Sequence, residues 1–440
     1  MIQKETFVLM LFSAALIGCV AVGLPILLAL AVGYGIFFTY AAGRGYSVCA
    51  ILKMSADGAL KAKNILISFL LIGMLTALWR AAGTIPVIVC FAADFLRPSV
   101  MFLMTFLLNC LVSFLTGTAF GTAATMGIIC MTMAQAMGCS PVLTGGAILS
   151  GVYFGDRMSP VSTSALLIAE LTKTNLFDNI RLMFASARLP FAAACMLYTA
   201  AGFLIPAAPA SAADIRLLFS GAFRLGLLPV LPAVVILLLS LFRVPVKQAM
   251  TASILTAVCI CLFWQKTSPA ELIWFIFGGF RLSDPALAAM INGGGIRSML
   301  NVMAIICISS SFSGIFDGTG LLTHLKETIA SLGRRTSPFA ATLLASIAAS
   351  AAACNQTLAI LLTHQVCVDV EPDKKRFAIF LENTSVVTAP LIPWSIACAV
   401  PLGSAGAPSA AVLAAFYLYL LPLWGLFTQT RPTHDTPSIG

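Results

Sequence analysis

The chain has 440 residues, of which 60% are hydrophobic and only 9% are charged. This balance excludes a soluble globular protein, in which roughly 25% of the residues are charged, and it indicates a polytopic membrane protein. The net charge of +9 does not indicate nucleic-acid binding, because the basic residues are scattered through short loops. Clusters of them near Lys53, Lys173, Arg243 and Lys326 suit cytoplasmic loops under the positive-inside rule.

Uncharged stretches follow one another along the chain, and most of them have the length that a membrane crossing needs, about 20 residues. They are residues 7–40, 65–78, 98–155, 189–213, 225–242, 248–265, 298–316, 336–368 and 383–430. The overlong stretches must fold back. The sequence therefore predicts an all-α polytopic membrane protein with about 10 to 12 transmembrane segments.

The stretch 98–155 contains a polar break and is followed at once by a carboxylate. The break is the run Thr116–Thr122 (TGTAFGT), which predicts an opened helix whose free backbone groups need protein or a water-filled cavity around them. Close packing of helices through small residues is the alternative interpretation. Asp156 follows the stretch, and a charge at the bilayer centre costs about 2.5 to 3.5 kcal/mol, so it is expected to face a polar pathway. Pro160 and the hydroxyl residues around it complete a predicted oxygen-lined site.

The same order of features returns later in the chain. A polar break, Cys354–Thr357 (CNQT), precedes Glu382, and Thr388 and two prolines follow that carboxylate. Two interrupted segments at corresponding positions of two halves are typical of a secondary transporter's binding site. The sequence therefore predicts a first membrane repeat at 1–205, a connector at 206–222, a second membrane repeat at 223–430 and a polar tail at 431–440.

Three runs together resemble the NhaC-type sodium/proton antiporters of the ion transporter superfamily: Gly146–Ser162 (GAILSGVYFGDRMSPVS), Gly293–Asn301 (GGGIRSMLN), and Glu382 with Pro390–Trp394 (PLIPW). The resemblance covers most of residues 117–394. It implies a multi-pass protein of the inner (cytoplasmic) membrane, with two inverted repeats and broken or re-entrant helices. It also implies a homodimer surrounded by membrane lipid that exchanges Na⁺ for H⁺ by alternating access, without a further cofactor. Members of the family also exchange small organic acids of the malate/lactate type with Na⁺ and H⁺, which is the alternative function.

Asp156 is the expected coupling residue and Na⁺ ligand. If Na⁺ and H⁺ compete for this one carboxylate, the site can reorient with either of them, and burial favours the neutral form that proton binding requires. Glu382 is expected to be its symmetry-related assistant, either as a second proton carrier or as a second ligand. Hydroxyls, amides and carbonyls near the breaks would complete an oxygen shell, and the candidates are Thr116, Thr118, Thr122, Ser159, Ser162, Thr163, Asn355, Gln356, Thr357 and Thr388. For each Ser and Thr the alternative is a hydrogen bond to the backbone one turn earlier.

Several charged residues allow a purely structural interpretation. Asp156 has Arg157 beside it, but adjacent positions of a helix point in different directions, so this pair is poorly placed for neutralisation. Glu382 follows Arg376 and is alternatively an ordinary residue at the membrane interface. Arg80 is expected to extend toward the interface, or else to face inward and pair with Asp156 or an organic carboxylate. The histidines His324 and His364 are expected to be ordinary residues and not proton relays.

An enzyme and a channel are the competing classes. The Gly155-Asp156 pair resembles the Gly-x-Gly-Asp element of intramembrane proteases, but Tyr153 and Phe154 before it break that pattern, and no His-Glu-x-x-His motif occurs. The 13 cysteines lie singly in apolar runs and are expected to be packing residues rather than metal ligands. The glycines Gly293 to Gly295 lack a following Lys-Ser/Thr, so they predict a loop or close-packing point and not a phosphate cradle. Duplicated breaks with carboxylates favour alternating access over a continuous pore.

Overall fold

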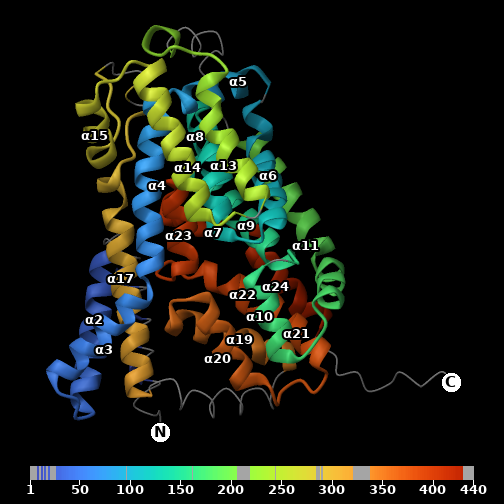
Figure 1. The fold of residues 1–440 in the computed structure, drawn as a ribbon. Coiled ribbons are helices and arrows are strands. Elements are labelled where there is room, and N and C mark those ends of the chain that lie inside the picture. The colour runs from blue at the N-terminus through green and yellow to red at the C-terminus, as the bar shows by residue number, and fades with distance from the viewer. Residues whose placement is uncertain are drawn as a thin grey trace.

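The computed structural model describes residues 7–8, 11–12, 14–15, 18–19, 26–95, 97–160, 162–205, 219–242, 244–283, 288, 291–320 and 337–429. In these ranges the chain is helical, apart from one isolated antiparallel bridge between Phe280 and Gly293. Most of the connector predicted at 206–222, the tail predicted at 431–440, Arg243, Lys326 and His324 lie outside the described residues. Figure 1 shows how the helices are arranged.

Six helical segments of the described ranges are long and apolar enough to cross a membrane: Lys63–Ala81, Pro98–Thr116, Ala119–Ala136, Leu176–Leu204, Val246–Trp264 and Ile296–Phe316. A bent pair, Lys374–Leu391 and Ile396–Ala405, meets at 58° and raises the number to seven if it counts as one span. The prediction of an all-α polytopic membrane protein is confirmed. The long helices are fewer than the 10 to 12 segments expected, because breaks divide several apolar stretches into shorter helices.

One side of the molecule is a bundle of long helices, at the left of Figure 1. It consists of α2 (Ile26–Gly43), α3 (Val48–Lys61), α4 (Lys63–Ala81) and α17 (Ile296–Thr319). Glycines let α3 and α17 meet backbone to backbone, since a Cβ at Gly58 would lie 2.4 Å from the carbonyl oxygen of Ser310, and one at Gly314 would lie 2.0 Å from that of Met54. Such small-residue contacts are typical of helix packing in membranes.

The glycine triplet before α17 is the close-packing point that its sequence predicts. Gly294 (φ 75°) and Gly295 (φ 79°) adopt left-handed conformations that favour glycine. The N–H of Gly295 donates to the carbonyl of Gly73 in α4 (2.8 Å), and a Cβ at Gly294 would lie 2.6 Å from the backbone nitrogen of Ala77. The triplet therefore attaches the start of α17 to α4.

Further helices lie toward the top of Figure 1 and along its right side. They are α5 (Thr84–Phe95), the one-turn helices η1 (Pro98–Val100) and η3 (Leu228–Val230), α11 (Leu176–Leu204), α13 (Leu231–Leu241), α14 (Val246–Cys259) with its π-helical end η4 (Ile260–Trp264), and α15 (Pro269–Gly278). The indole N–H of Trp79 in α4 donates to the hydroxyl of Ser253 in α14 (3.0 Å), which ties this group to the long-helix bundle.

Two helices of equal length end in the same kind of break. α6 (Met101–Thr116) and α19 (Pro338–Ala353) each have 16 residues. Each ends at a left-handed residue, Gly117 (φ 66°) or Cys354 (φ 54°), and an extended residue then caps the next helix. After the first break follow α7 (Ala119–Thr122), the π-helical turn η2 (Ala123–Gly127) and α8 (Ile128–Ala136); after the second follows α20 (Gln356–Cys367). The polar breaks predicted from the sequence are therefore present.

A second pair of segments also matches in length. The first is α9 (Pro141–Met158) followed by α10 (Thr163–Thr172); the second is the run Lys374–Leu391 followed by α23 (Ile396–Ala405). That run contains α21 (Lys374–Asn383), α22 (Ser385–Thr388) and η5 (Ala389–Leu391), and η6 (Ser409–Ala414) and α24 (Phe416–Thr428) end the described chain. Both α10 and α23 have 10 residues, begin after a serine cap and end at a left-handed residue.

This register bears on the expectation that the two carboxylates are related by symmetry. When the caps Ser162 and Ser395 are aligned, Asp156 corresponds to Ala389, and Glu382 corresponds to Leu149. Asp156 and Glu382 are therefore not at equivalent positions of the two segments. Their different spacing from the preceding break has this origin in part, and the different lengths of the segments between each break and α9 or α21 contribute the rest.

Candidate ion-binding site

Helix α9 carries Asp156 near its C-terminus and lies between the upper and lower groups of helices in Figure 1, close to the labels of α7 and α23. The glycines of α9 allow its backbone to lie directly against the backbone of α6. A Cβ at Gly151 would lie 2.6 Å from the carbonyl oxygen of Phe106, and one at Gly155 would lie 2.4 Å from the backbone nitrogen of Phe114. This backbone contact fixes the height and rotation of α9, and with them the position of Asp156.

The carboxylate of Asp156 is buried and is held by two serines of the following helix. The hydroxyl of Ser162 donates to Oδ1 (3.1 Å), and the hydroxyl of Ser164 donates to Oδ2 (3.2 Å). The two serine oxygens are 2.8 Å apart, and Ser162 caps α10 by accepting the N–H of Ser164. Since the cap fixes both hydroxyls, the break between α9 and α10 presents a carboxylate and two hydroxyl oxygens in one place. Oxygens of these types are what a hard cation binds.

Arg157 is fully buried and points to other helices than Asp156 does. Its Nε donates to the backbone carbonyl of Glu382 (3.1 Å), Nη1 donates to the hydroxyl of Tyr417 (3.2 Å), and Nη2 donates to Oγ of Ser186 (3.3 Å) and to Oδ1 of Asn383. Arg157 thus connects α9 with α11, α21 and α24. All four acceptors are neutral groups, which agrees with the expectation that it does not neutralise Asp156 directly.

Glu382 is fully buried, and both of its carboxyl oxygens lack a hydrogen-bond partner in the part of the chain that the structure describes. The charges of Arg157 and Asp156 both act on it. Arg376 forms an ion pair with Glu371 (3.4 Å), and Lys375 forms one with Asp178 (2.9 Å). Glu382 is thus a carboxyl group buried within the protein among charges.

The threonines of the first break bond to one another. Thr118 accepts the N–H of Gly121 (3.2 Å), Thr122 donates to the carbonyl of Thr118 (2.8 Å), and the hydroxyls of Thr116 and Thr122 are 3.2 Å apart. The bond from Thr122 to the residue one turn earlier is the structural alternative that the sequence leaves open. These contacts satisfy the polar groups of the break inside the protein.

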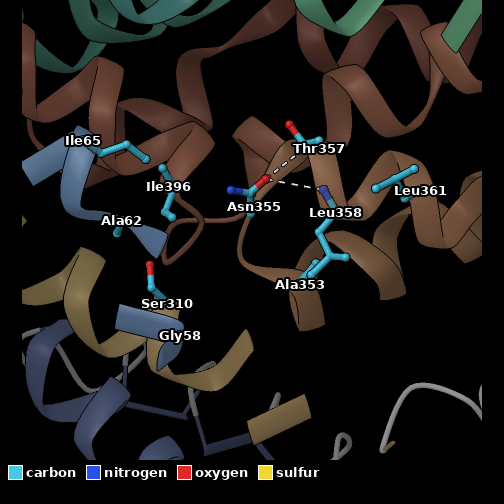
Figure 2. Close-up of a pocket in the computed structure, with 10 residues that line it drawn as sticks. All are labelled: Gly58, Ala62, Ile65, Ser310, Ala353, Asn355, Thr357, Leu358, Leu361 and Ile396. Carbon is cyan, nitrogen blue, oxygen red and sulfur yellow. Dashed lines mark hydrogen bonds between the residues drawn. The ribbon is translucent and has the colours of Figure 1, made fainter. Parts of the chain in front are cut away.

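The second break borders a cavity of about 250 Å³, shown in Figure 2. Oδ1 of Asn355 accepts the N–H groups of Thr357 (2.9 Å) and Leu358 (3.4 Å), while its amide nitrogen points toward Ile396. The polar side chains of Ser310, Asn355 and Thr357 face an otherwise apolar lining, which also includes Gly58, Ala62, Ile65, Ala353, Leu358, Leu361 and Ile396. Gln356 and Thr388 are engaged elsewhere: Gln356 donates to the carbonyl of Val386 (3.2 Å), and Thr388 lies 3.2 Å from the hydroxyl of Ser350.

The structure brings some of the expected site residues together and leaves others apart. Ser162 contacts Asp156, and Ser159 is buried at the end of α9. Thr163, between the two serines that hold Asp156, is exposed. Ser164 is one of the hydroxyl residues around Pro160 that the sequence places in an oxygen-lined site, and it also donates to Asp156. Because Ser162 caps the helix, Ser164 lies close to its hydroxyl.

The remaining candidates lie away from Asp156. Nη1 of Arg80 donates to the carbonyl of Thr76 within α4 (2.8 Å), and the imidazole of His364 packs against the ring of Phe377 with centroids 5.6 Å apart. In the described ranges no group of three or more His, Cys, Asp or Glu residues is placed to hold a metal ion. The candidate site therefore consists of Asp156, its two serines, Arg157 and Glu382.

Comparison with known proteins matches residues 151–425 to the Na⁺/H⁺ antiporter family, a range that includes all five of these residues. The chain is 29% identical over 395 residues to the Na⁺/H⁺ antiporter NhaC of Bacillus subtilis (strain 168), which covers 86% of each protein. It is 26% identical over 385 residues to the malate-2H⁺/Na⁺-lactate antiporter of the same organism, covering 84% of this chain and 82% of the relative. It is also 26% identical over 406 residues to the arginine/ornithine antiporter ArcD of Halobacterium salinarum, covering 88% and 83%.

Proposed function

The chain belongs to the Na⁺/H⁺ antiporter family, and from this premise we propose that it exchanges Na⁺ for H⁺ across the cytoplasmic membrane by alternating access. It is a multi-pass membrane transporter and not an enzyme. The observation that carries the proposal is the buried carboxylate of Asp156, held by the hydroxyls of Ser162 and Ser164 at a helix break. A carboxylate inside a membrane protein marks an ion or proton pathway by default.

In this proposal Na⁺ binds at Asp156. The carboxylate supplies the negative charge, Ser162 and Ser164 supply hydroxyl oxygens, and backbone carbonyls freed where α9 ends are available as further ligands. Ser159 lies at this break. Glu382 is the second carboxyl group of the site. The threonines Thr116, Thr118 and Thr122 and the amides Asn355 and Gln356 remain candidates for the lining of the path toward it.

The matching segments support a proposal about architecture. We propose that residues 1–205 and 223–430 form two repeats of inverted topology, because α6 and α19 are equal in length, as are α9 and the run Lys374–Leu391, and α10 and α23. The caps that end α6 and α19, and those that begin and end α10 and α23, also have the same conformations. Broken helices at the interface of such repeats are typical of secondary transporters. If the shorter apolar helices pair to complete further crossings, the total reaches the expected 10 to 12 or so. We further propose that the transporter is a homodimer.

The function is tested with the purified protein in liposomes that contain a pH-sensitive dye. Outward or inward gradients of Li⁺, Na⁺, K⁺, malate and lactate are imposed one at a time. The proposal is supported if a flow of Na⁺ drives H⁺ in the opposite direction and empty liposomes show no such pH change. A steady Na⁺ current without a pH change would identify a channel and contradict it.

Removing the serine hydroxyls is expected to weaken Na⁺ binding without abolishing exchange. Each hydroxyl bonds to a charged carboxylate, and such bonds contribute about 1.5 to 3 kcal/mol, so Ser164→Ala should raise the Na⁺ concentration for half-maximal exchange by about tenfold. The matched control is Thr163→Val, because Thr163 lies between the two serines but is exposed. Equal effects of the two substitutions would mean that Ser164 has no part in the site.

A second function, exchange of a small organic acid with Na⁺ and H⁺, is favoured by the cavity at the second break. About 250 Å³ exceeds what one ion needs, and the cavity lies at the N-terminus of α20, where the helix dipole favours negative charge. The relative named a malate-2H⁺/Na⁺-lactate antiporter is similar over most of the chain. A pH change that requires malate or lactate in the same liposomes would establish this function in place of simple Na⁺/H⁺ exchange.

A further inference from the structure

We propose that Na⁺ and H⁺ bind to different carboxyl groups of this site: Asp156 takes the Na⁺, Glu382 takes the H⁺, and Arg157 supplies a permanent positive charge that keeps both loaded states neutral. This inference rests on the proposed Na⁺/H⁺ exchange and assigns its two ions. It replaces the simpler expectation that both ions compete for Asp156.

The surroundings of the two carboxyl groups differ. Both oxygens of Asp156 accept a hydrogen bond from a serine hydroxyl, an arrangement that stabilises the ionised form. Both oxygens of Glu382 are fully buried and accept none from the described residues. An ionised carboxylate in that position is strongly unfavourable, and a buried group of this kind takes up a proton instead. Of the two carboxyl groups, these surroundings favour Glu382 as the one that carries the proton and Asp156 as the one that stays ionised.

Arg157 makes this arrangement electrically neutral. Its guanidinium is fully buried, and the groups that it bonds to are the neutral side chains of Ser186, Asn383 and Tyr417 and the backbone carbonyl of Glu382. Its positive charge is thus not cancelled by a partner within hydrogen-bond distance. It balances the ionised Asp156 across the site while Glu382 is protonated.

The positive charge of Arg157 also explains how binding of Na⁺ is coupled to release of H⁺. When Na⁺ binds at Asp156, the site gains one positive charge, which favours release of the proton from Glu382. The carboxylate of Glu382 then balances Arg157, and Na⁺ balances Asp156. One Na⁺ has entered and one H⁺ has left, so the loaded site is neutral again. A buried cluster without net charge is the form that moves across a membrane at the lowest cost.

No other charged group intervenes in the described neighbourhood of Glu382. From α9, the charges of Asp156 and Arg157 act on the carboxyl group of Glu382. From α24, the hydroxyl of Tyr417 interacts with Arg157 and Glu382. On the other helices packed against α21, Glu170 of α10 and Asp178, Arg181 and Arg188 of α11 are exposed, and His364 of α20 lies against the ring of Phe377. The uncharged Tyr198 of α11 donates to the carbonyl of Ala414, Cys367 of α20 is a buried neutral thiol, and Arg376 of α21 itself pairs with Glu371. The charge balance therefore depends on Asp156, Arg157 and Glu382.

The test compares the wild type with Glu382→Gln and with the double variant Arg157→Gln plus Glu382→Gln, all in liposomes. Two quantities are measured: Na⁺-driven proton movement with a pH dye, and ²²Na⁺/Na⁺ counterflow, which needs no proton. Glutamine imitates the protonated Glu382 and cannot release a proton, so Glu382→Gln should lower proton movement by about tenfold or more and raise the Na⁺ requirement of counterflow by about tenfold. The double variant removes the uncompensated charge of Arg157, so its Na⁺ requirement should return to within about threefold of the wild type while proton movement stays absent.

Two results would overturn the inference. Wild-type proton movement by Glu382→Gln would place the proton on Asp156. A double variant that elutes as folded protein yet needs as much Na⁺ as Glu382→Gln would mean that the charge of Arg157 does not balance the site. Because Glu382→Gln preserves the shape of the side chain, its proton measurement decides the assignment even if the double variant does not fold. A wild type without Na⁺-driven proton movement would instead contradict the proposed function itself.

Discussion

Replacing Asp156 with asparagine is expected to abolish Na⁺-driven proton movement while the protein still folds. Asparagine has the same shape and keeps an oxygen that can accept a hydrogen bond from Ser162 or Ser164. It lacks the negative charge that attracts Na⁺ into a buried site, and the loss of a charge partner in such surroundings corresponds to about 3 to 5 kcal/mol. Exchange should therefore fall by about two orders of magnitude or more, measured as the initial rate of the pH change in liposomes.

The matched control is Glu170→Gln, which neutralises an exposed carboxylate on α10, the helix that also carries Ser164. This variant should exchange at the wild-type rate. Expression and the elution profile of Asp156→Asn in detergent should match those of the wild type. Exchange by Asp156→Asn at more than a tenth or so of the wild-type rate, with unchanged Na⁺ dependence, would remove Asp156 from the site.

Replacing Gly155 with valine is expected to disrupt both the fold and the site. A Cβ at this position would lie 2.4 Å from the backbone nitrogen of Phe114, 2.4 Å from Cβ of Ser113 and 2.7 Å from the carbonyl oxygen of Cys110. These are mostly backbone atoms of α6, so the clash is relieved only if α6 and α9 move apart. Overpacking in a dense core costs about 1 to 3 kcal/mol, and the branched side chain adds atoms beyond Cβ. The thermal midpoint in detergent should fall by several degrees, and exchange should be lost because Asp156 is the next residue.

Gly35→Val is the control for the loss of a helical glycine. Gly35 lies in α2, and a Cβ at this position would have no atom within 4 Å, so valine meets open space there. This variant should keep the wild-type thermal midpoint and the wild-type exchange rate. If Gly155→Val is as stable as Gly35→Val, α6 and α9 do not pack through their backbones.

The class of protein and the position of the main carboxylate could be predicted from the sequence. A low content of charge and repeated apolar stretches are direct consequences of a lipid environment, so composition alone identifies a membrane protein. The polar breaks at Gly117 and Cys354 were also predictable, because glycine, threonine and asparagine within apolar stretches disfavour a continuous helix. Asp156 was identifiable because a carboxylate beside a long uncharged stretch requires a polar environment.

The details of the site could not be predicted, because they depend on how far each helix extends. Whether Thr163 or Ser164 faces Asp156 is decided by the phase of α10, which Ser162 sets as its cap. The bonds of Arg157 to α11, α21 and α24 join residues that lie far apart in the sequence. No local pattern encodes them.

The relation between Asp156 and Glu382 could not be predicted from the sequence either. In the sequence both follow a polar break and precede prolines, which makes them look equivalent. The helix lengths align Asp156 with Ala389 and Glu382 with Leu149. Sequence order does not reveal the register between two segments when the loops before them differ in length. The unequal surroundings of the two carboxyl groups are consistent with different roles in exchange.

The central claim, that this chain exchanges Na⁺ for H⁺, is tested most directly by following both ions in the same vesicles. Wild-type protein is reconstituted, the interior is made acidic, and ²²Na⁺ uptake and internal pH are recorded together in the absence of organic acids. The account predicts that ²²Na⁺ accumulates while the interior becomes alkaline, and that neither occurs in protein-free vesicles. Dissipation of the pH gradient without ²²Na⁺ accumulation, or ²²Na⁺ accumulation only after malate or lactate is added, would contradict it.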